Sequence, residues 1–293
     1  ATISWLGQER SSSIDGRDYD DGTSGEDERI MDYFAVDIPR HKTERFLSSI
    51  SVDNDETTIE ASTVRNYGDR MPSRMNAALI ASANGLLTFH RTHRFCSMCG
   101  SPSRQTKAGS ARRCTNDECR TSVYPRIDPA VIMLITSPCG EYALLGRKKS
   151  WPAGRYSTLA GFAEVGETLE ECVVRETLEE SGVAVDSESI QFVASQPWPF
   201  PRSMMVGFTG KAVACDADDD IMDDNISLPN ITVDPIELDN AKWFSKEYIR
   251  TNGLVEGRGS SALDFEPDDE EAEFHVPGPA SLARLLITKW ANI

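Results

Sequence analysis

The sequence predicts an α+β protein in which a mixed sheet lies between helices, preceded by a small cysteine-containing module and a small N-terminal α/β domain. Three observations predict this class. Four cysteines lie in two close pairs in mid-chain. A capped, glutamate-rich helical pattern follows them, flanked by strand-like apolar segments. The chain has 293 residues, 39% of them hydrophobic, enough for more than one core. We place the domains at 1–94, 95–123 and 124–293.

The N-terminal region combines strand and helix signals. Apolar residues alternate over 3–6 and 33–38, which predicts two strands, and the polar segment 8–29 between them predicts a surface loop. A helical pattern covers 75–90 and leads directly to the first cysteine pair. We therefore expect this helix to abut the cysteine module.

The cysteine pairs predict a structural zinc site. A Cys-x2-Cys pair is followed, after 14 residues, by a Cys-x4-Cys pair; the four are Cys96, Cys99, Cys114 and Cys119. Four thiolates complete a tetrahedral Zn²⁺ shell and leave no position for a reacting water. The module is therefore interpreted as a zinc ribbon that binds one structural ion. The remaining cysteines, Cys139, Cys172 and Cys215, are predicted to be buried thiols.

Charge is distributed unevenly along the chain. The formal net charge of -17 repels polyphosphates, so an enzyme for such substrates needs divalent cations or a local basic patch. The acidic stretches 216–224 and 264–273 are predicted to be solvated insertions. Segment 91–126 instead carries eight Lys or Arg residues and two acids. These arginines either offset the charge of the tetrathiolate or bind nucleic-acid phosphates.

The C-terminal half shows the signals of a sheet with a closing helix. Strands are predicted at 130–135 and 142–145, joined by a turn at Gly140, and again at 191–195 and 204–213. An amphipathic helix is predicted at 280–290. No apolar run approaches the roughly 20 residues that span a bilayer, so we expect a soluble protein without a membrane partner.

Segment 161–183 predicts a helix with inward-facing carboxylates. Thr168 and Glu171 form a capping box at its start, and Gly182 suits its end. At about 100° per residue, the apolar stripe continues into glutamates; its members are Leu169, Cys172, Val173, Glu176 and Glu180, with Glu179 at the edge. Carboxylates beside an apolar face need a compensating cation, and oxygen ligands select Mg²⁺ or Mn²⁺.

This segment resembles the Nudix box, G-x5-E-x7-R-E-U-x-E-E-x-G-U, where U is aliphatic. The matching positions are Gly161, Glu167, Arg175, Glu176, Glu179, Glu180, Gly182 and Val183. Thr177 departs from the pattern, because it replaces an aliphatic residue and brings a hydroxyl that needs a partner. The resemblance implies a Nudix fold and a pyrophosphohydrolase.

Segment 195–203 resembles the SQPWPFPxS array of NADH pyrophosphatases within the Nudix superfamily. The resemblance implies hydrolysis of the pyrophosphate bond of NAD(H)-like dinucleotides to AMP and nicotinamide mononucleotide. One alternative is removal of NAD caps from RNA by the same chemistry, which is compatible with the first activity. A non-catalytic nucleotide- or RNA-binding module is a third reading, disfavoured by the intact acidic set.

The resemblance also implies roles for individual residues. Glu176, Glu180 and Glu237, with the main-chain carbonyl of Ala160, would hold the catalytic metals, and Glu179 would assist water. Phe162 and Tyr124 would stack on a base, Tyr124 across a homodimer interface. The other expected pocket residues are Gln196, Pro197, Trp198, Pro199, Phe200, Pro201, Arg202, Ser203 and Ala283. The family and the terminal triplet 291–293, distantly similar to an SKL-type address, suggest peroxisome or cytosol.

Overall fold

The computed structural model describes residues 3–11, 29–38, 42, 74–214, 221–222, 226–254 and 274–292. They divide into two compact units. The described residues of the N-terminal unit fall within 3–126 and Pro199–Arg202, and those of the C-terminal unit within Ile127–Trp198 and 203–292. Cys215 and nearly all of the two acidic stretches lie outside the described residues.

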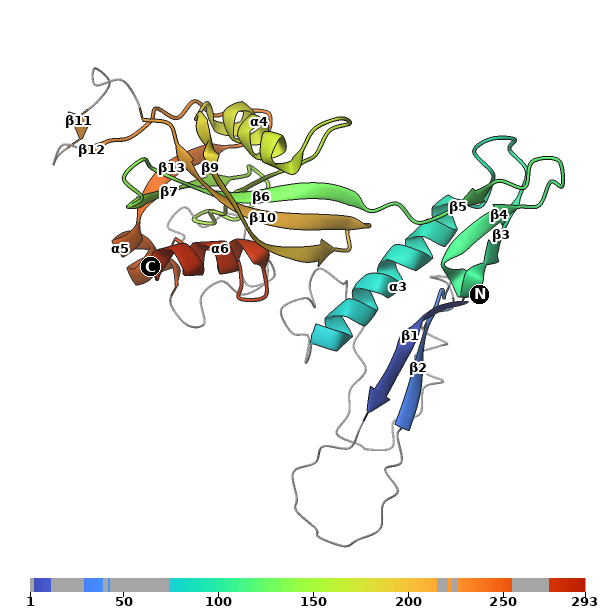
Figure 1. Ribbon diagram of the computed structural model, residues 1–293. Helices are drawn as coiled ribbons and strands as arrows, with labels where there is room; N and C mark the ends of the chain where they lie inside the picture. Colours follow the sequence, from blue (N-terminus) through green and yellow to red (C-terminus); the bar gives the residue numbers. More distant parts are fainter. Residues whose placement is uncertain are drawn as a thin grey trace, which may run out of the picture. The chain divides into compact units, whose positions relative to one another are not determined.

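The N-terminal unit begins with an antiparallel pair, β1 (Ile3–Ser11) and β2 (Arg29–Val36), followed by helix α3 (Arg74–Thr92) (Figure 1). The two strands confirm the prediction, but the predicted loop at 8–29 is wrong at both ends, since β2 already begins at Arg29. Residues 8–11 belong to β1 because each pairs with a residue of β2, and this backbone ladder overrides their polar composition. Arg91, near the end of α3, donates from Nε to Asp37 Oδ2 at 3.0 Å.

The cysteine module is a three-stranded antiparallel sheet in the order β3-β4-β5. Its strands are β3 (Ser103–Thr106), β4 (Ala111–Cys114) and β5 (Ser122–Val123), with a 3₁₀ turn, η3 (Lys107–Gly109), between the first two. His90 of α3 donates from Nε2 to the Gly109 carbonyl at 2.7 Å. Its Nδ1 then accepts from Arg112 Nη1 at 3.3 Å, which confirms that the helix abuts the module.

The C-terminal unit contains a six-stranded mixed sheet in the order β13-β7-β6-β10-β9, with β8 also paired to β6. The pairing of β10 with β6 is parallel and the other pairings are antiparallel. The strands are β6 (Asp128–Thr136), β7 (Tyr142–Arg147), β8 (Leu159–Phe162), β9 (Val185–Trp198), β10 (Ser203–Ala212) and β13 (Asn240–Ser245). A short separate hairpin joins β11 (Ile221–Met222) to β12 (Ile226–Ser227).

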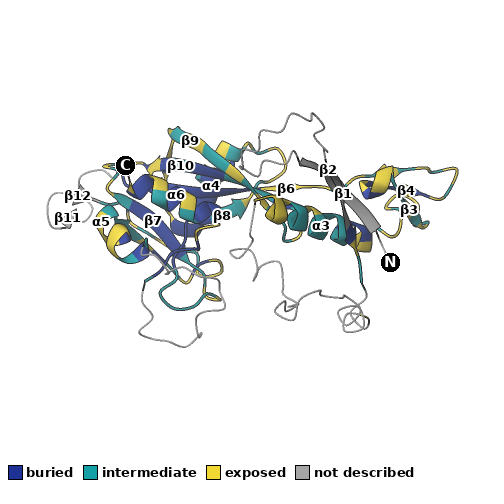
Figure 2. Ribbon diagram, turned by 90° about the horizontal axis from the view of Figure 1, so that it is seen from below, coloured by how far each residue is buried: buried dark blue, intermediate teal, exposed yellow. Residues whose placement is uncertain are grey.

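Helices cover the two faces of this sheet (Figure 1). Along β6, Val131, Met133 and Ile135 pack in one buried cluster with α4 (Leu169–Ser181). Ile132 and Leu134 pack in the opposite cluster with α6 (Leu282–Ala291). Figure 2 shows the buried strands that result. Successive side chains of a strand point to opposite faces, so β6 is apolar over the stretch 130–135 that packs against both helices. The predicted mixed sheet between helices is confirmed.

Short helical turns, α5 (Lys246–Tyr248) and the π-helical η4 (Ile249–Gly253), follow β13. Trp290 of α6 donates from its indole to the carbonyl of Gly140, the predicted turn residue, which has φ of +81°. Cys172 is buried as predicted, but Cys139 is exposed, because it lies in the turn between β6 and β7. None of the helices in the described part of the chain has the length and hydrophobicity of a membrane-spanning segment.

Candidate metal-dependent active site

Helix α4 begins and ends where its sequence predicts. The Glu171 amide donates to Thr168 Oγ1 at 3.2 Å, and the Thr168 amide donates to Glu171 Oε2 at 2.8 Å, so the capping box is complete. Gly182 ends the helix with φ of +71°, a conformation that favours glycine. The Thr177 hydroxyl donates to the Val173 carbonyl at 2.7 Å, so this departure from the Nudix box leaves no unpaired group.

Three carboxylates meet beside this helix. Glu176 and Glu180 are 8% and 1% exposed, and Glu237 comes from the loop before β13. One carboxylate oxygen from each lies within 4.8 Å of the others. Among the described residues, no donor meets hydrogen-bond geometry with either oxygen of Glu180. Burial raises the pKa of Glu180 to about 8, and the positive charge of Lys148 opposes this only in part. Burial also raises the pKa of Glu176. The set fits a divalent cation, which would neutralise and coordinate these oxygens.

Backbone contacts with the end of α4 place Glu237. The Thr232 amide donates to the Ser181 carbonyl at 2.8 Å, and the Asp234 amide donates to the Glu180 carbonyl at 3.2 Å. The Glu237 amide then donates to the Asp234 carbonyl at 3.1 Å in a turn. These bonds bring Glu237 to residues that lie more than 50 positions earlier in the chain.

Arg175 organises the acidic residues around it. Its Nε and Nη2 donate to the two carboxylate oxygens of Glu167 at 2.7 and 2.9 Å. Its Nη1 donates to both Glu176 Oε1 and Glu179 Oε2 at 2.9 Å. The guanidinium lowers the pKa of Glu167 to about 2 and keeps that carboxylate charged. Arg175 is therefore a positioning residue for Glu176 and Glu179.

Gly161 of β8 leaves the space that Glu176 occupies. A Cβ on this glycine would lie 1.8 Å from the carboxyl carbon of Glu176 and 2.1 and 2.2 Å from its oxygens. No side chain fits at that separation while the carboxylate stays in place. Glycine at the first position of the Nudix box therefore makes room for the carboxylate of Glu176, a predicted metal ligand. Ala160, one residue earlier, pairs with Ile132 on β6, and the metal-binding role of its carbonyl remains a prediction.

The predicted substrate array is divided between the two units. Gln196 donates from Nε2 to the Ala280 carbonyl at 2.7 Å and accepts from the Leu282 amide at 3.0 Å, so its amide holds the start of α6. Pro197 and Trp198 end β9, where they pair with Met204 and Ser203 of β10. Ala283 is only 4% exposed and packs among the α6 residues.

The rest of the array, Pro199–Arg202, packs within the N-terminal unit. Asn84 of α3 donates from Nδ2 to the Pro199 carbonyl at 2.6 Å. A Cβ on Gly85 would lie 3.3 Å from Arg202 Cγ, so this small residue allows the approach. The Arg202 guanidinium lies 5.9 Å from the Phe89 ring centroid. These contacts hold the proline-rich turn against α3.

The two predicted aromatic platforms have exposed rings. Phe162 is 56% exposed, and its carbonyl accepts from Arg175 Nη2 at 3.0 Å, beside the carboxylates. Tyr124 is 53% exposed in the N-terminal unit, where its hydroxyl accepts from Lys107 Nζ at 2.8 Å. The exposure of Phe162 leaves its ring accessible, whereas Lys107 Nζ lies over the Tyr124 ring, 4.8 Å from its centroid.

The four paired cysteines converge as the zinc prediction requires. The Cys96 and Cys119 sulfurs lie 3.8 Å apart, and those of Cys99 and Cys114 lie 3.5 Å apart. Tetrahedral Zn–S bonds of about 2.3 Å imply S···S separations of about 3.8 Å. Amide N–H groups lower the pKa of Cys99 to about 6, whereas burial raises that of Cys114 to about 12. The sulfur set fits a structural Zn²⁺ ion.

Sequence reasoning assigned no site role to three residues that the structure places near the carboxylates. Arg175 and Gly161 are fixed positions of the Nudix box, so the motif itself could have suggested them. Lys148 lies between β7 and β8 and acts electrostatically on Glu180. No sequence pattern marked Lys148, because its proximity to Glu180 depends on how the segment between β7 and β8 folds.

Family models match both modules. The NUDIX domain model matches residues 126–262, and the NADH pyrophosphatase zinc ribbon domain model matches residues 91–124. NAD-capped RNA hydrolase NUDT12 from Homo sapiens is 31% identical over 282 residues, which are 91% of this chain and 54% of the relative. NAD-capped RNA hydrolase NudC from Mycobacterium bovis is 36% identical over 232 residues, 79% of this chain and 66% of the relative. The chain thus spans about half to two thirds of these relatives.

The fold, the acidic cluster and the matching family model together place the chain in the Nudix class. The zinc ribbon that precedes the Nudix domain assigns the chain to a narrower family within this class. The chain belongs to the Nudix family that carries the NADH pyrophosphatase zinc ribbon, the combination that the sequence predicts.

Proposed function

We propose that the chain hydrolyses the pyrophosphate bond of NAD(H)-like dinucleotides and releases AMP and nicotinamide mononucleotide. The observation that carries this proposal is the cluster of Glu176, Glu180 and Glu237 oxygens within 4.8 Å of one another. A chain with a net charge of -17 needs cations to bind a pyrophosphate, and this cluster is suited to hold them. The array at 195–203 supports a dinucleotide as the substrate.

Glu176, Glu180 and Glu237, with the Ala160 carbonyl, would hold Mg²⁺ or Mn²⁺. Such ions neutralise a pyrophosphate and lower the pKa of a bound water. Arg175 keeps Glu176 and Glu179 in position through its Nη1 donors. Arg175 donates to Glu179 Oε2, and no described residue donates to Glu179 Oε1, which would take a proton from the attacking water. The water oxygen bonds to one phosphorus as the bond from that phosphorus to the bridging oxygen breaks.

Removal of NAD caps from RNA is the second candidate activity, and it breaks the same bond. Two observations favour it. The relatives NUDT12 and NudC are named NAD-capped RNA hydrolases, and segment 91–126 carries eight basic and two acidic side chains. An RNA chain contributes phosphates that a free dinucleotide lacks, so a basic ribbon would favour the capped RNA.

The decisive experiment supplies NADH, NAD⁺ and NAD-capped RNA to the full chain with Mg²⁺, Mn²⁺ or EDTA. Chromatography should show metal-dependent release of AMP and the nicotinamide mononucleotide from the dinucleotides, and of nicotinamide mononucleotide and 5′-phosphorylated RNA from the capped RNA. Glu180→Gln should abolish most turnover, whereas Glu170→Gln, on the exposed face of α4, should not. Release of nicotinamide with ADP-ribose would place the cut at the glycosidic bond and contradict the proposal.

We also propose that the active form is a homodimer, as the family resemblance implies. The half-exposed Tyr124 ring supports this, because an exposed aromatic side chain is a common component of interfaces. Light scattering on the eluting protein at several concentrations should give twice the mass of 32.4 kDa. A monomer that retains full turnover would contradict a dimeric active form.

A further inference from the structure

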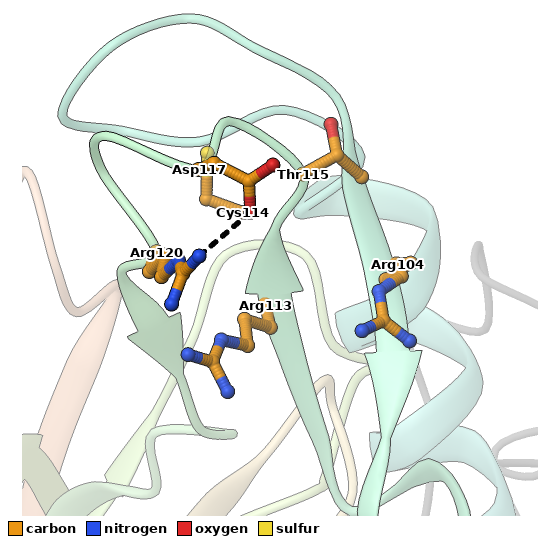
Figure 3. Close-up of a pocket in the computed structure, with 6 residues that line it drawn as sticks. All are labelled: Arg104, Arg113, Cys114, Thr115, Asp117 and Arg120. Carbon is orange, nitrogen blue, oxygen red and sulfur yellow. Dashed lines mark hydrogen bonds and ion pairs between the residues drawn. The ribbon is translucent and has the colours of Figure 1, made fainter.

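The zinc ribbon carries a cavity of about 290 Å³ that lies apart from the carboxylate cluster in the chain. Its lining residues are Arg104, Arg113, Cys114, Thr115, Asp117 and Arg120. Figure 3 shows the three guanidinium groups on strands and turn of the same small sheet, with Asp117 and Thr115 at one end. Three positive groups therefore face a space that only one acidic side chain shares.

Arg104 and Arg113 are direct cross-strand neighbours in the pairing of β3 with β4. Both are exposed, and within the described part of the chain neither has an acidic or hydrogen-bond partner. Like charges directly opposite each other destabilise an antiparallel pair. Folding alone therefore does not account for two arginines here, whereas an anion between them would.

Arg120 adds the third charge from the turn that follows Cys119. It donates from Nη2 to Asp117 Oδ1 at 3.1 Å, but both side chains are largely exposed, at 61% and 90%. Such an exposed pair contributes little to stability and is easily exchanged for another anion. The three guanidinium groups that line the cavity thus outnumber its one carboxylate.

Arg112, in contrast to Arg113, is anchored by contacts within the ribbon. It is buried, donates to Ser103 Oγ at 2.7 Å and to the Ser103 carbonyl at 2.6 Å, and contacts His90. Strand alternation sends the Arg113 side chain to the face opposite that of Arg112. Arg113 has none of the anchoring contacts of Arg112, so the two neighbours differ in role.

We propose that Arg104, Arg113 and Arg120 form a binding site for the phosphodiester groups of a single-stranded RNA chain. One guanidinium group can donate two parallel hydrogen bonds to two oxygens of a phosphate. An open, exposed site suits a polyanion, because several of its phosphates can bind at the same time. This inference rests on the second candidate activity, cap removal. A free dinucleotide has only two phosphates, both needed at the carboxylates, so the ribbon site would act on capped RNA alone.

The test uses the full chain and an uncapped, 5′-hydroxyl RNA oligonucleotide, which the enzyme cannot cleave at a cap. Fluorescence anisotropy gives its Kd for the wild type, for Arg104→Glu, and for the matched control Arg74→Glu. Arg74 is exposed at the start of α3, about 28 Å along that helix from its other end. Arg104→Glu should weaken RNA binding about tenfold or more, and the control should change it less than about twofold.

Salt dependence provides a second readout that a purely structural role would not produce. Replacing Arg104 and Arg113 by Gln together should reduce the slope of log K against log salt by about 1.4, or about 0.7 for each lost single-strand contact. The thermal midpoint of Arg104→Glu should stay level or rise, because Glu opposite Arg113 replaces a repulsive pair by an attractive one. Its zinc content should remain that of the wild type.

Unchanged RNA affinity in Arg104→Glu would overturn the proposal. Loss of zinc from that variant would overturn it as well, because the arginines would then be compensating the thiolates. Wild-type affinity for inorganic phosphate equal to that for the oligonucleotide would identify a free-anion site instead. NADH turnover is measured separately, so a chain that binds RNA through these arginines but cleaves no dinucleotide would contradict only the proposed function.

Discussion

Replacing Gly161 by alanine should displace the carboxylate of Glu176, a predicted metal ligand, without changing any acidic residue. The new Cβ would lie 1.8 Å from the carboxyl carbon of Glu176, whereas ordinary contact begins at about 3.4 Å. The carboxylate must therefore move by about 1.6 Å. Because Mg²⁺ binds oxygen at about 2.0–2.1 Å with strict geometry, a carboxylate displaced this far no longer coordinates it.

The fold should survive this change. Gly161 pairs with Val131 on β6, and the atoms that the methyl group meets are the end of one flexible side chain. We expect kcat for NADH to fall by roughly 10², equivalent to about 2.7 kcal/mol of transition-state stabilisation, and half-maximal turnover to need more Mg²⁺. The thermal midpoint of the metal-free protein should change by only a few degrees.

A double-mutant cycle tests the assigned cause. If Gly161→Ala acts only through Glu176, the variant Gly161→Ala/Glu176→Ala should have the same kcat as Glu176→Ala alone. Steady-state rates at saturating Mg²⁺ and circular dichroism melts supply the two readouts. Additive losses, or normal Mg²⁺ dependence in Gly161→Ala, would refute the reasoning and assign Gly161 a backbone role.

Four further predictions follow from the same contacts. Glu180→Gln should lower kcat by about 10² or more with the fold intact, since a ligand oxygen and a charge leave the cluster; Glu170→Gln is the control. Cys96→Ser should lower zinc content, by elemental analysis, and thermal stability more than metal-dependent chemistry. Phe162→Ala should impair NADH cleavage by about tenfold to a hundredfold and largely spare a pyrophosphate substrate without nicotinamide. Glu167 has a folded pKa lowered to about 2, so its contribution to stability is present above about pH 4.5 and is lost as pH falls toward 2. Denaturant melts should therefore show Glu167→Gln destabilised at pH 7 and similar to wild type near pH 2.

Each of these has an outcome that would contradict it. Near-normal turnover in Glu180→Gln would remove this residue from the metal site, and a protein purified without chelators that holds no zinc would remove the ribbon ion. Equal loss on both substrates in Phe162→Ala would make the ring a support for the catalytic residues. A stability difference for Glu167→Gln that persists near pH 2 would mean that Arg175 is not the source of its stabilisation.

The sequence by itself determined the elements that depend on interactions between residues close together in the chain. The capping box at Thr168 and the terminal Gly182 bounded α4, and the stripe through Cys172 and Val173 indicated which glutamates are buried. Cysteine spacing predicted the sulfur cluster. These predictions succeed because hydrogen bonds within one helical turn, and metal ligands within one short segment, depend mainly on residues close together in the chain.

Tertiary structure decided what depends on distant residues. The extension of β1 to Ser11 required its partner strand, and the exposure of Cys139 followed from its place in a turn. Only the folded chain brought Glu237 beside Glu180, through backbone contacts across the end of α4, and left the Glu180 carboxylate without a hydrogen bond from any described residue. The pairing of Arg104 with Arg113 likewise depends on strand register, because register is set by the whole sheet rather than by either strand.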